Sequence, residues 1–138
     1  MAAERRYQNE VRVYVAGQEI RDVYSCSYSI RTEMARSGLP TGNARPYRIH
    51  IIRRSESETP GFEWAHISKP DAHQSGKIEF YNTRGEIFKT FEWDRGYVAH
   101  YKEGVPDLTN AERATMLEEY VICAEEFRCG ESTVNCHW

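Results

Sequence analysis

The sequence predicts one mostly antiparallel β domain with a single short helix near residues 60–68. Apolar and polar residues alternate with a period of two in several segments, which is the pattern of half-buried strands. Turn-forming residues separate these segments at short intervals, which favours antiparallel neighbours. The 138 residues fit one domain (1–138), and 9 Tyr, 5 Phe and 3 Trp provide bulk for its core.

The first half of the chain carries three predicted strands. Valines at every second position predict a strand over 11–15, and Ala16-Gly17-Gln18 supplies a tight turn after it. Over 23–30, rings and other apolar side chains fall on one face and small hydroxyls on the other. This pattern predicts a strand in a sheet that is covered on one face. Alternation over 47–51 predicts the third strand.

Residues 31–46 form a long predicted loop between the second and third strands. Turn formers are dense over Ser37–Asn43. Long loops in compact domains often have a function. The residues that we single out there are three arginines, two glycines, a leucine and a proline: Arg31, Arg36, Gly38, Leu39, Pro40, Gly42 and Arg45.

A short helix is predicted after the third strand. Thr59 suits an N-cap, and Pro60 suits the first helical position because its fixed φ is helical. Phe62 and Ala65 then form one short apolar face. Lys69-Pro70 ends the predicted helix.

The middle of the chain predicts a meander. Strands are expected over 76–81, 87–93 and 97–101, with turns at 82–85 and 94–96. Short connections of this kind place consecutive strands side by side and antiparallel.

The last segment carries two conflicting patterns. Four apolar residues between Leu117 and Ala124 have the spacing of an amphipathic helix, whereas the run 120–123 favours a strand. Sheet closure needs a last strand after 97–101, and tertiary pairing can override a weak local propensity. We therefore predict a strand over Tyr120–Phe127.

Composition excludes several classes of function. The net charge of -3 and the pI near 6.0 leave no basic excess to bind nucleic acid or anionic lipid. No apolar run approaches the ~18–20 residues of a membrane span. Residues 1–10 lack a stretch of signal-peptide type, so we expect a protein made in the cytosol that does not leave it by an ordinary signal route.

No constellation for catalysis or cofactor binding stands out. The glycines of 38–42 are followed by Asn43-Ala44, where a phosphate-binding loop needs Lys and Ser or Thr. Glu118-Glu119 and Glu125-Glu126 are adjacent pairs, and in a strand adjacent side chains point to opposite faces. The sequence thus predicts no enzyme, no cofactor and no metal.

The cysteines offer the one candidate metal site. Cys123, Cys129, Cys136 and His137 are soft ligands, but the cysteine gaps of six and seven positions do not resemble paired zinc knuckles. We predict reduced, partly buried thiols without essential chemistry. A small metal-dependent enzyme using Cys129, Cys136 and His137 stays open as an alternative.

An ordered set of segments from about Val11 to Trp138 resembles the Hcp/TssD family, the inner-tube protein of the type VI secretion system. The strongest segment is Tyr24–Ser29, followed by the polar loop with its glycines and proline. The others are Phe62-Glu63-Trp64 with Pro70, Gly76–Tyr81, Ala124-Glu125-Glu126 and Asn135–Trp138. The chain departs from the family in Arg45-Pro46-Tyr47, in the helical character of 107–119 and in its four cysteines.

The resemblance implies a compact antiparallel β-barrel of two packed sheets with one short helix on its flank. It also implies hexameric rings that stack into a hollow tube, which a contractile sheath propels and whose lumen can carry effectors. Spike and baseplate proteins would be further partners, and export would use the secretion apparatus itself. The loop at 31–46 would be the ring-stacking element.

A second interpretation keeps the fold and changes the assembly. The chain could be a tail-tube-like or adaptor β-barrel binding module of a related contractile injection system.

Overall fold

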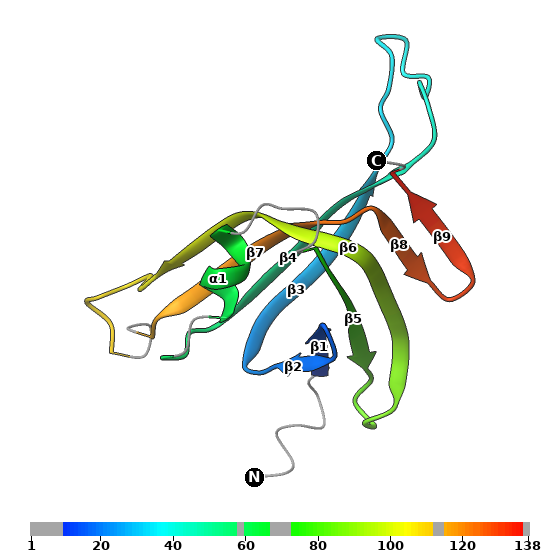
Figure 1. Ribbon diagram of the computed structural model, residues 1–138. Helices are drawn as coiled ribbons and strands as arrows, with labels where there is room; N and C mark the ends of the chain where they lie inside the picture. The colour runs from blue at the N-terminus through cyan, green and yellow to red at the C-terminus, as the bar shows by residue number, and fades with distance from the viewer. Residues whose placement is uncertain (1–9, 58–59, 67–72, 112–114, 137–138) are drawn as a thin grey trace.

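The computed structural model describes residues 10–57, 60–66, 73–111 and 115–136 (Figure 1). The elements in these residues are, in chain order, β1 (Glu10–Val15), β2 (Gln18–Ile20), β3 (Val23–Arg31), β4 (Arg45–Arg54), α1 (Pro60–His66), β5 (Gln74–Tyr81), β6 (Ile87–Gly104), β7 (Leu117–Cys123), β8 (Glu126–Cys129) and β9 (Ser132–Asn135). The predicted mostly β class with one short helix is confirmed.

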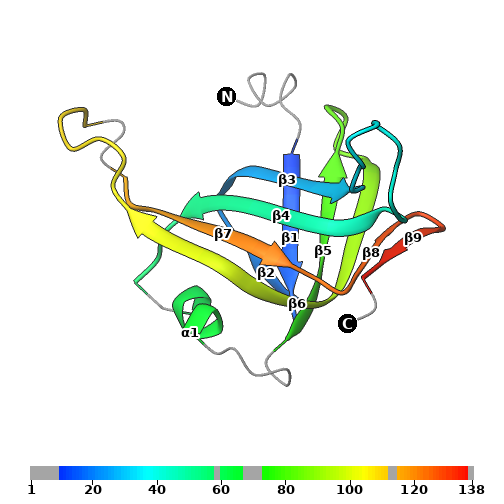
Figure 2. The same cartoon turned by 90° about the horizontal axis from the view of Figure 1, so that it is seen from above.

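Two antiparallel sheets share the long strand β6 (Figure 2). One sheet holds β1, β2, β5, β8 and β9 with the first half of β6, and the other holds β3, β4 and β7 with its second half. The hydrogen-bonded path runs β2-β1-β5-β6-β7-β4-β3. The two-sheet arrangement therefore depends on one strand that bends between the sheets.

The sheets do not close into a continuous barrel. In the described part of the chain, β2 and β3 end the hydrogen-bonded path and do not pair with each other. β1 cannot close the gap either, because β2 and β5 already occupy its two edges. The expected compact barrel is thus open on one side, which leaves an unpaired edge on β2 and on β3.

The core lies between the two sheets and follows the predicted alternation. Val13, Ile49, Ile51, Ile78 and Ile122 are fully buried. Trp93 is also fully buried, and the backbone at two glycines leaves room for its ring. A Cβ built on Gly76 would lie 2.2 Å from Trp93 Cζ2, and one on Gly96 would lie 2.5 Å from Trp93 Nε1. Both positions therefore need glycine.

The expected turn at 94–96 is a bend inside β6. The strand runs without interruption from Ile87 to Gly104, and Arg95 adopts a φ of +53°. Asp94 still pairs with Glu126 of β8, whereas Tyr97 pairs with Cys123 of β7. Asp94-Arg95-Gly96 has the residue types of a turn, but here they let one strand pass from one sheet to the other.

The structure confirms β structure over the predicted range Tyr120–Phe127 but divides it between two strands. β7 ends at Cys123 and β8 begins at Glu126, because the chain changes sheet between them. Tyr120 is 3% exposed and Ile122 is fully buried, whereas Val121 between them is only half-buried, so burial alternates as it does in a strand.

The predicted ring-bearing face of 23–30 is only half buried. Cys26 and Tyr28 are partly buried against the core, whereas Tyr24 and Ile30 are 61% and 53% exposed. The pairing register of β3 with β4 shifts between Val23 and Ser25 and again between Ser29 and Ile30. At the first shift Tyr24 is the extra residue on β3 and turns away from the core, and Ile30 lies at the second shift, next to the end of the strand.

The short helix lies where it was predicted. α1 covers Pro60–His66 and buries Trp64, and a Cβ on Gly61 would lie 1.9 Å from Tyr120 Oη. The predicted N-cap Thr59 and the predicted stop Lys69-Pro70 lie outside the described residues.

Candidate assembly surfaces

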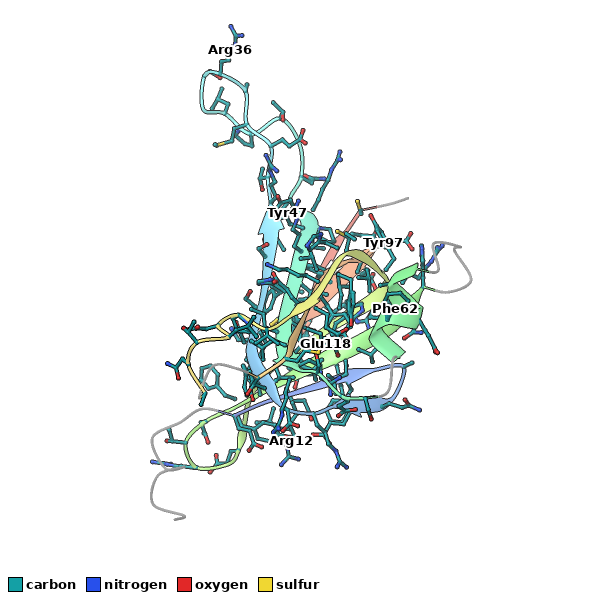
Figure 3. All side chains as sticks on the ribbon, turned by 90° about the vertical axis from the view of Figure 1, so that its left-hand side faces the viewer. Arg12, Arg36, Tyr47, Phe62, Tyr97 and Glu118 are labelled. Carbon is teal, nitrogen blue, oxygen red and sulfur yellow. The ribbon has the colours of Figure 1, made fainter. Side chains whose placement is uncertain are left out.

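The loop between β3 and β4 stands away from the two sheets (Figures 1 and 3). A bridge between Met34 and Pro40 closes it. Inside the bridge, Ala35 N donates to Leu39 O at 2.8 Å and Gly38 N donates to Ala35 O at 2.9 Å. Gly38 has a φ of +87°, a conformation that side-chain-bearing residues rarely adopt. The loop thus has its own turn structure, held by backbone hydrogen bonds.

The end of this loop presents apolar side chains to solvent. Met34 and Leu39 are 70% and 67% exposed. Arg36, which lies between them in the sequence, is at the far end of the loop (Figure 3). Exposed apolar side chains next to a cation form a surface suited to a protein contact.

Two of the predicted arginines lie at the root of the loop. Arg31 and Arg45 form the last facing pair of β3 and β4. The Arg31 guanidinium lies 5.3 Å from the centroid of the Tyr47 ring, which supplies a cation–π contact. Gly42 lies on the returning arm, where an added Cβ would meet no atom within 4 Å. The structure therefore gathers all seven predicted residues on one projecting hairpin.

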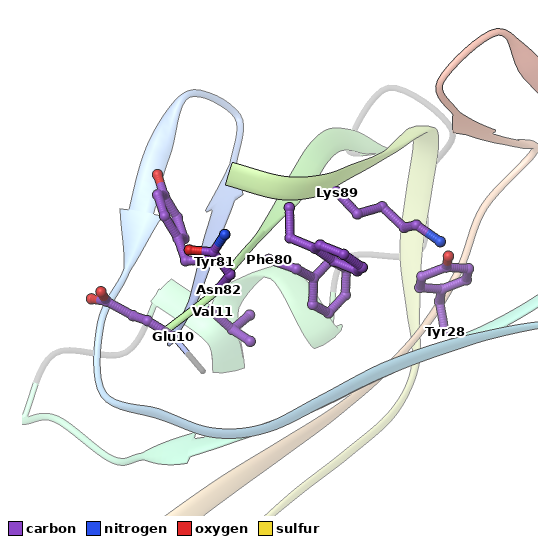
Figure 4. A pocket seen from close by; sticks show the side chains of 8 residues that line it. Glu10, Val11, Tyr28, Phe80, Tyr81, Asn82 and Lys89 are labelled. Carbon is purple, nitrogen blue, oxygen red and sulfur yellow. The ribbon is translucent and has the colours of Figure 1, made fainter. Parts of the chain in front are cut away.

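An apolar groove of about 450 Å³ opens between β1, β3 and the β5–β6 hairpin (Figure 4). It lies toward the end of the molecule opposite the loop, since Figure 3 places Arg36 at one end and Arg12, next to Val11, at the other. The residues that line the groove are Glu10, Val11, Tyr28, Phe80, Tyr81, Asn82, Phe88 and Lys89.

Phe88 is the most exposed apolar residue of the groove, at 72%. The sequence pattern did not predict this groove. The available signal was Ile87-Phe88, two bulky apolar residues adjacent in a strand, of which one must face away from the core.

The groove has an aromatic floor and charged sides. The Tyr28 ring stacks on Phe91 with centroids 3.8 Å apart, and its hydroxyl donates to Cys129 Sγ at 4.0 Å. Burial, followed by this hydrogen bond, raises the pKa of Tyr28, so the phenol stays neutral. Glu10 and Lys89 contribute one carboxylate and one ammonium group.

The cysteines do not form a metal site in the described part of the chain. Cys26, Cys123, Cys129 and Cys136 are free and half-buried, and no three His, Cys, Asp or Glu side chains among the described residues are placed to hold an ion. His137, the fourth ligand of the alternative site, lies outside those residues. Burial raises the pKa of the Cys26 thiol to about 12. No helix in the described ranges has the length and apolar character to cross a bilayer.

Comparisons with known proteins identify a family and several solved structures to which this chain is similar. The family model of hemolysin coregulated protein Hcp (TssD) matches residues 8–138. The fold is similar to Hcp1 from Flavobacterium johnsoniae, with a TM-score of 0.75, 24% identity and coverage of 91% of this chain and 98% of that chain.

Two further structures share the fold. Hcp1 from E. coli EAEC 042 has a TM-score of 0.68 at 12% identity, covering 93% of this chain and 98% of that one. A chain from a sheath/tube terminator structure of the extracellular contractile injection system PVC has a TM-score of 0.60 at 17% identity, covering 87% and 92%. No curated protein matches by sequence.

Proposed function

This chain belongs to the Hcp (TssD) family of type VI secretion tube proteins, and on that premise we propose how it assembles the tube. Copies close side by side into hexameric rings, and rings stack head to tail through the β3–β4 loop. Stacking is supported by one observation. The molecule has a loop with an apolar tip at one end and an apolar groove toward the other end. Surfaces that differ at the two ends generate a heterologous contact, which repeats along an axis.

The loop and the groove have matching chemistry. Met34 and Leu39 offer flexible apolar side chains of the kind that fill irregular hollows. Phe80 and Phe88 supply the apolar walls of the groove. Burying the two exposed side chains there stabilises the stack by about 3–5 kcal/mol before the cost of ordering the loop is subtracted.

Charges orient the contact. Arg36 at the loop tip can pair with Glu10 of the next copy, and Glu33 of the loop can pair with Lys89. An arginine suits such an interface because its guanidinium binds a carboxylate in a bidentate way. The paired arginines Arg31 and Arg45 at the root give the loop end a further positive charge.

The open sheet edges suit lateral closure. In the described residues, β2 and β3 each present one row of backbone N–H and C=O groups without a strand partner. A neighbouring copy that covers these edges removes the aggregation risk of an exposed edge. Tyr24 on β3 is 61% exposed, and tyrosine is a residue type that is enriched at protein interfaces.

The remaining partners follow from the family. We infer that the stacked rings contact sheath, spike and baseplate proteins, that effectors can occupy the lumen, and that the tube protein leaves the cell through the apparatus. The role is structural, without catalysis. An assembly as a tail-tube-like or adaptor module of a related injection system is the second candidate, which the likeness to the PVC chain favours.

Replacing Ser37–Asn43 by a Gly/Ser linker of equal length tests the stacking proposal. Negative-stain imaging and light scattering should show single rings that no longer form tubes, and secretion should fall. Tubes of normal length would overturn the axial role of the loop, whereas loss of the rings themselves would assign it to the lateral contact.

A further inference from the structure

A cleft of about 610 Å³ lies between the β1–β2 hairpin and α1. It is separate from the loop and from the apolar groove. Ile20 and Glu19 of β2 line one side, Glu63 and Trp64 of α1 line another, and Tyr120 contributes from β7. Its walls thus combine apolar rings with carboxylates.

Trp64 carries a buried hydrogen-bond donor, the Nε1–H of its indole. The side chain is 7% exposed, and in the described part of the chain nothing accepts a hydrogen bond from its Nε1–H. The core residue Trp93 shows the usual arrangement, because its Nε1–H donates to Gln74 O at 3.1 Å. Buried donors in native proteins nearly always have a partner. Trp64 also lines the cleft, so a ligand that reaches the edge of its indole would need to offer an acceptor oxygen.

The rim of the cleft favours a positively charged ligand. Glu19 and Glu63 are exposed and form no ion pair with any described residue. Glu56 also lines the cleft and is already paired with Arg53 at 2.8 Å. Arg21 adds one positive charge to the lining, which leaves the rim with an acidic excess.

The cleft borders an open strand edge. β2 pairs with β1 alone among the described strands, so its outer edge has free backbone groups. An extended peptide can add to such an edge through main-chain hydrogen bonds. A ligand that lies along β2 would bring carbonyl oxygens toward the cleft and basic side chains toward its rim.

We propose that this cleft binds the basic N-terminal segment, residues 1–9, of a second copy of the chain. The segment contains Arg5-Arg6. It is continuous with β1, and nine extended residues span up to ~30 Å, enough to cross a subunit boundary. The Glu10 end of β1 and α1 lie on opposite sides of the molecule in Figure 2, as a head-to-tail lateral contact requires. The assignment to a second copy depends on the ring proposed above.

A synthetic peptide of residues 1–9 tests the site. The host is the full-length chain carrying Arg5→Glu and Arg6→Glu, whose own segment no longer competes. Titration should move the Trp64 indole N–H resonance, identified by its loss in Trp64→Phe, and leave that of Trp93 in place. Glu19→Lys with Glu63→Lys in the host should weaken binding about tenfold or more. Trp64→Phe should weaken it about tenfold, as measured with a fluorescent peptide.

The controls separate the site from nonspecific charge and from misfolding. A peptide with both arginines changed to glutamate should not bind, and circular dichroism must show that each host variant is folded. Restored binding of this acidic peptide to the lysine-rim host would confirm the charge pairing. A Trp64 resonance that stays in place at millimolar peptide, in a folded host, overturns the proposal.

A mixing experiment decides between a second copy and the same chain. Labelled host with the acidic segment is mixed with unlabelled chain that has the native segment and the lysine rim. The Trp64 resonance of the host shifts only if the segment acts between copies. A shift seen in the native chain but not in the mixture overturns the second-copy assignment. Light scattering on the same samples reports ring formation separately, so rings without a shift reject the cleft and leave the tube proposal intact.

Discussion

Arg53 and Glu118 form a buried ion pair between β4 and β7, with Arg53 Nη1 2.8 Å from Glu118 Oε1 and each residue 5% exposed. The two residues are register partners in the ladder. Tyr120 and Tyr101 donate their hydroxyls to the same carboxylate at 2.5 and 2.7 Å. Burial, followed by these hydrogen bonds, raises the pKa of both phenols above the usual range, so they remain donors.

Glu118→Gln should lower the free energy of unfolding by about 3 kcal/mol, because it removes the buried counter-charge of Arg53 and leaves that guanidinium only the more exposed Glu56. Urea unfolding measures the change. Glu103→Gln, which alters an exposed carboxylate on the neighbouring strand, should stay within about 0.5 kcal/mol of the parent. A Glu118 variant as stable as this control would show that the pair is not the stabilising feature of the second sheet.

Met34→Ser combined with Leu39→Ser should abolish stacking and preserve rings, because it removes the apolar tip and keeps the backbone of the loop. Tube length in negative stain is the measurement. Leu108→Ser is the matched control, since Leu108 is 83% exposed but lies in the β6–β7 connection. Tubes as long as those of the control would count against the tip as the contact.

Phe88→Ser should shorten tubes to a similar degree, because Phe88 lines the groove that we assign to the loop tip. Ile87→Ser is the control from the same strand, since Ile87 is 53% exposed and is not among the groove residues. Combining Phe88→Ser with the loop variant should add little, as expected for two sides of one contact. Additive losses would indicate two independent contacts.

Acid should weaken the fold in part through Glu119. The hydrogen bond with His50 on the adjacent strand holds the pKa of Glu119 below its ordinary value. A carboxylate with a lowered folded-state pKa contributes stability above its unfolded pKa of ~4.3, and this is lost as pH falls through the folded pKa. The difference in melting temperature between parent and Glu119→Gln should therefore be larger at pH 6 than at pH 3. A constant difference across this range would refute the linkage.

The Cys26 thiol should resist alkylation in the folded protein. Its pKa of about 12 leaves almost no thiolate at pH 8, and its half-buried position limits access. Mass spectrometry should find iodoacetamide modification of Cys26 much slower than in urea-unfolded chain.

Cys129→Ser and Cys136→Ser should leave ring assembly intact. Loss of assembly together with bound zinc in the parent would instead support the metal alternative.

For the adjacent carboxylates Glu118 and Glu119, the period of two along a strand is enough to predict which face each occupies. The sequence predicts that Glu118 and Glu119 point to opposite faces of a strand, and the structure places Glu118 in the buried pair and Glu119 against His50 on the other side. The partner of Glu119 is His50, whose side chain is 38% exposed. The partner comes from a strand 69 residues away, so local pattern could not identify it.

The sequence by itself determined the class of the fold, most strands, the short helix and the position of the projecting loop, because alternation and turn chemistry act over a few residues. Tertiary structure alone decided that Asp94-Arg95-Gly96 bends one strand between two sheets and that the strand predicted over Tyr120–Phe127 divides after Cys123. It also decided that the sheet path stays open and that Glu19, Glu63 and Trp64 share a cleft. These features depend on pairing between segments far apart in the chain, whose energies outweigh local preference and are not written in any one segment.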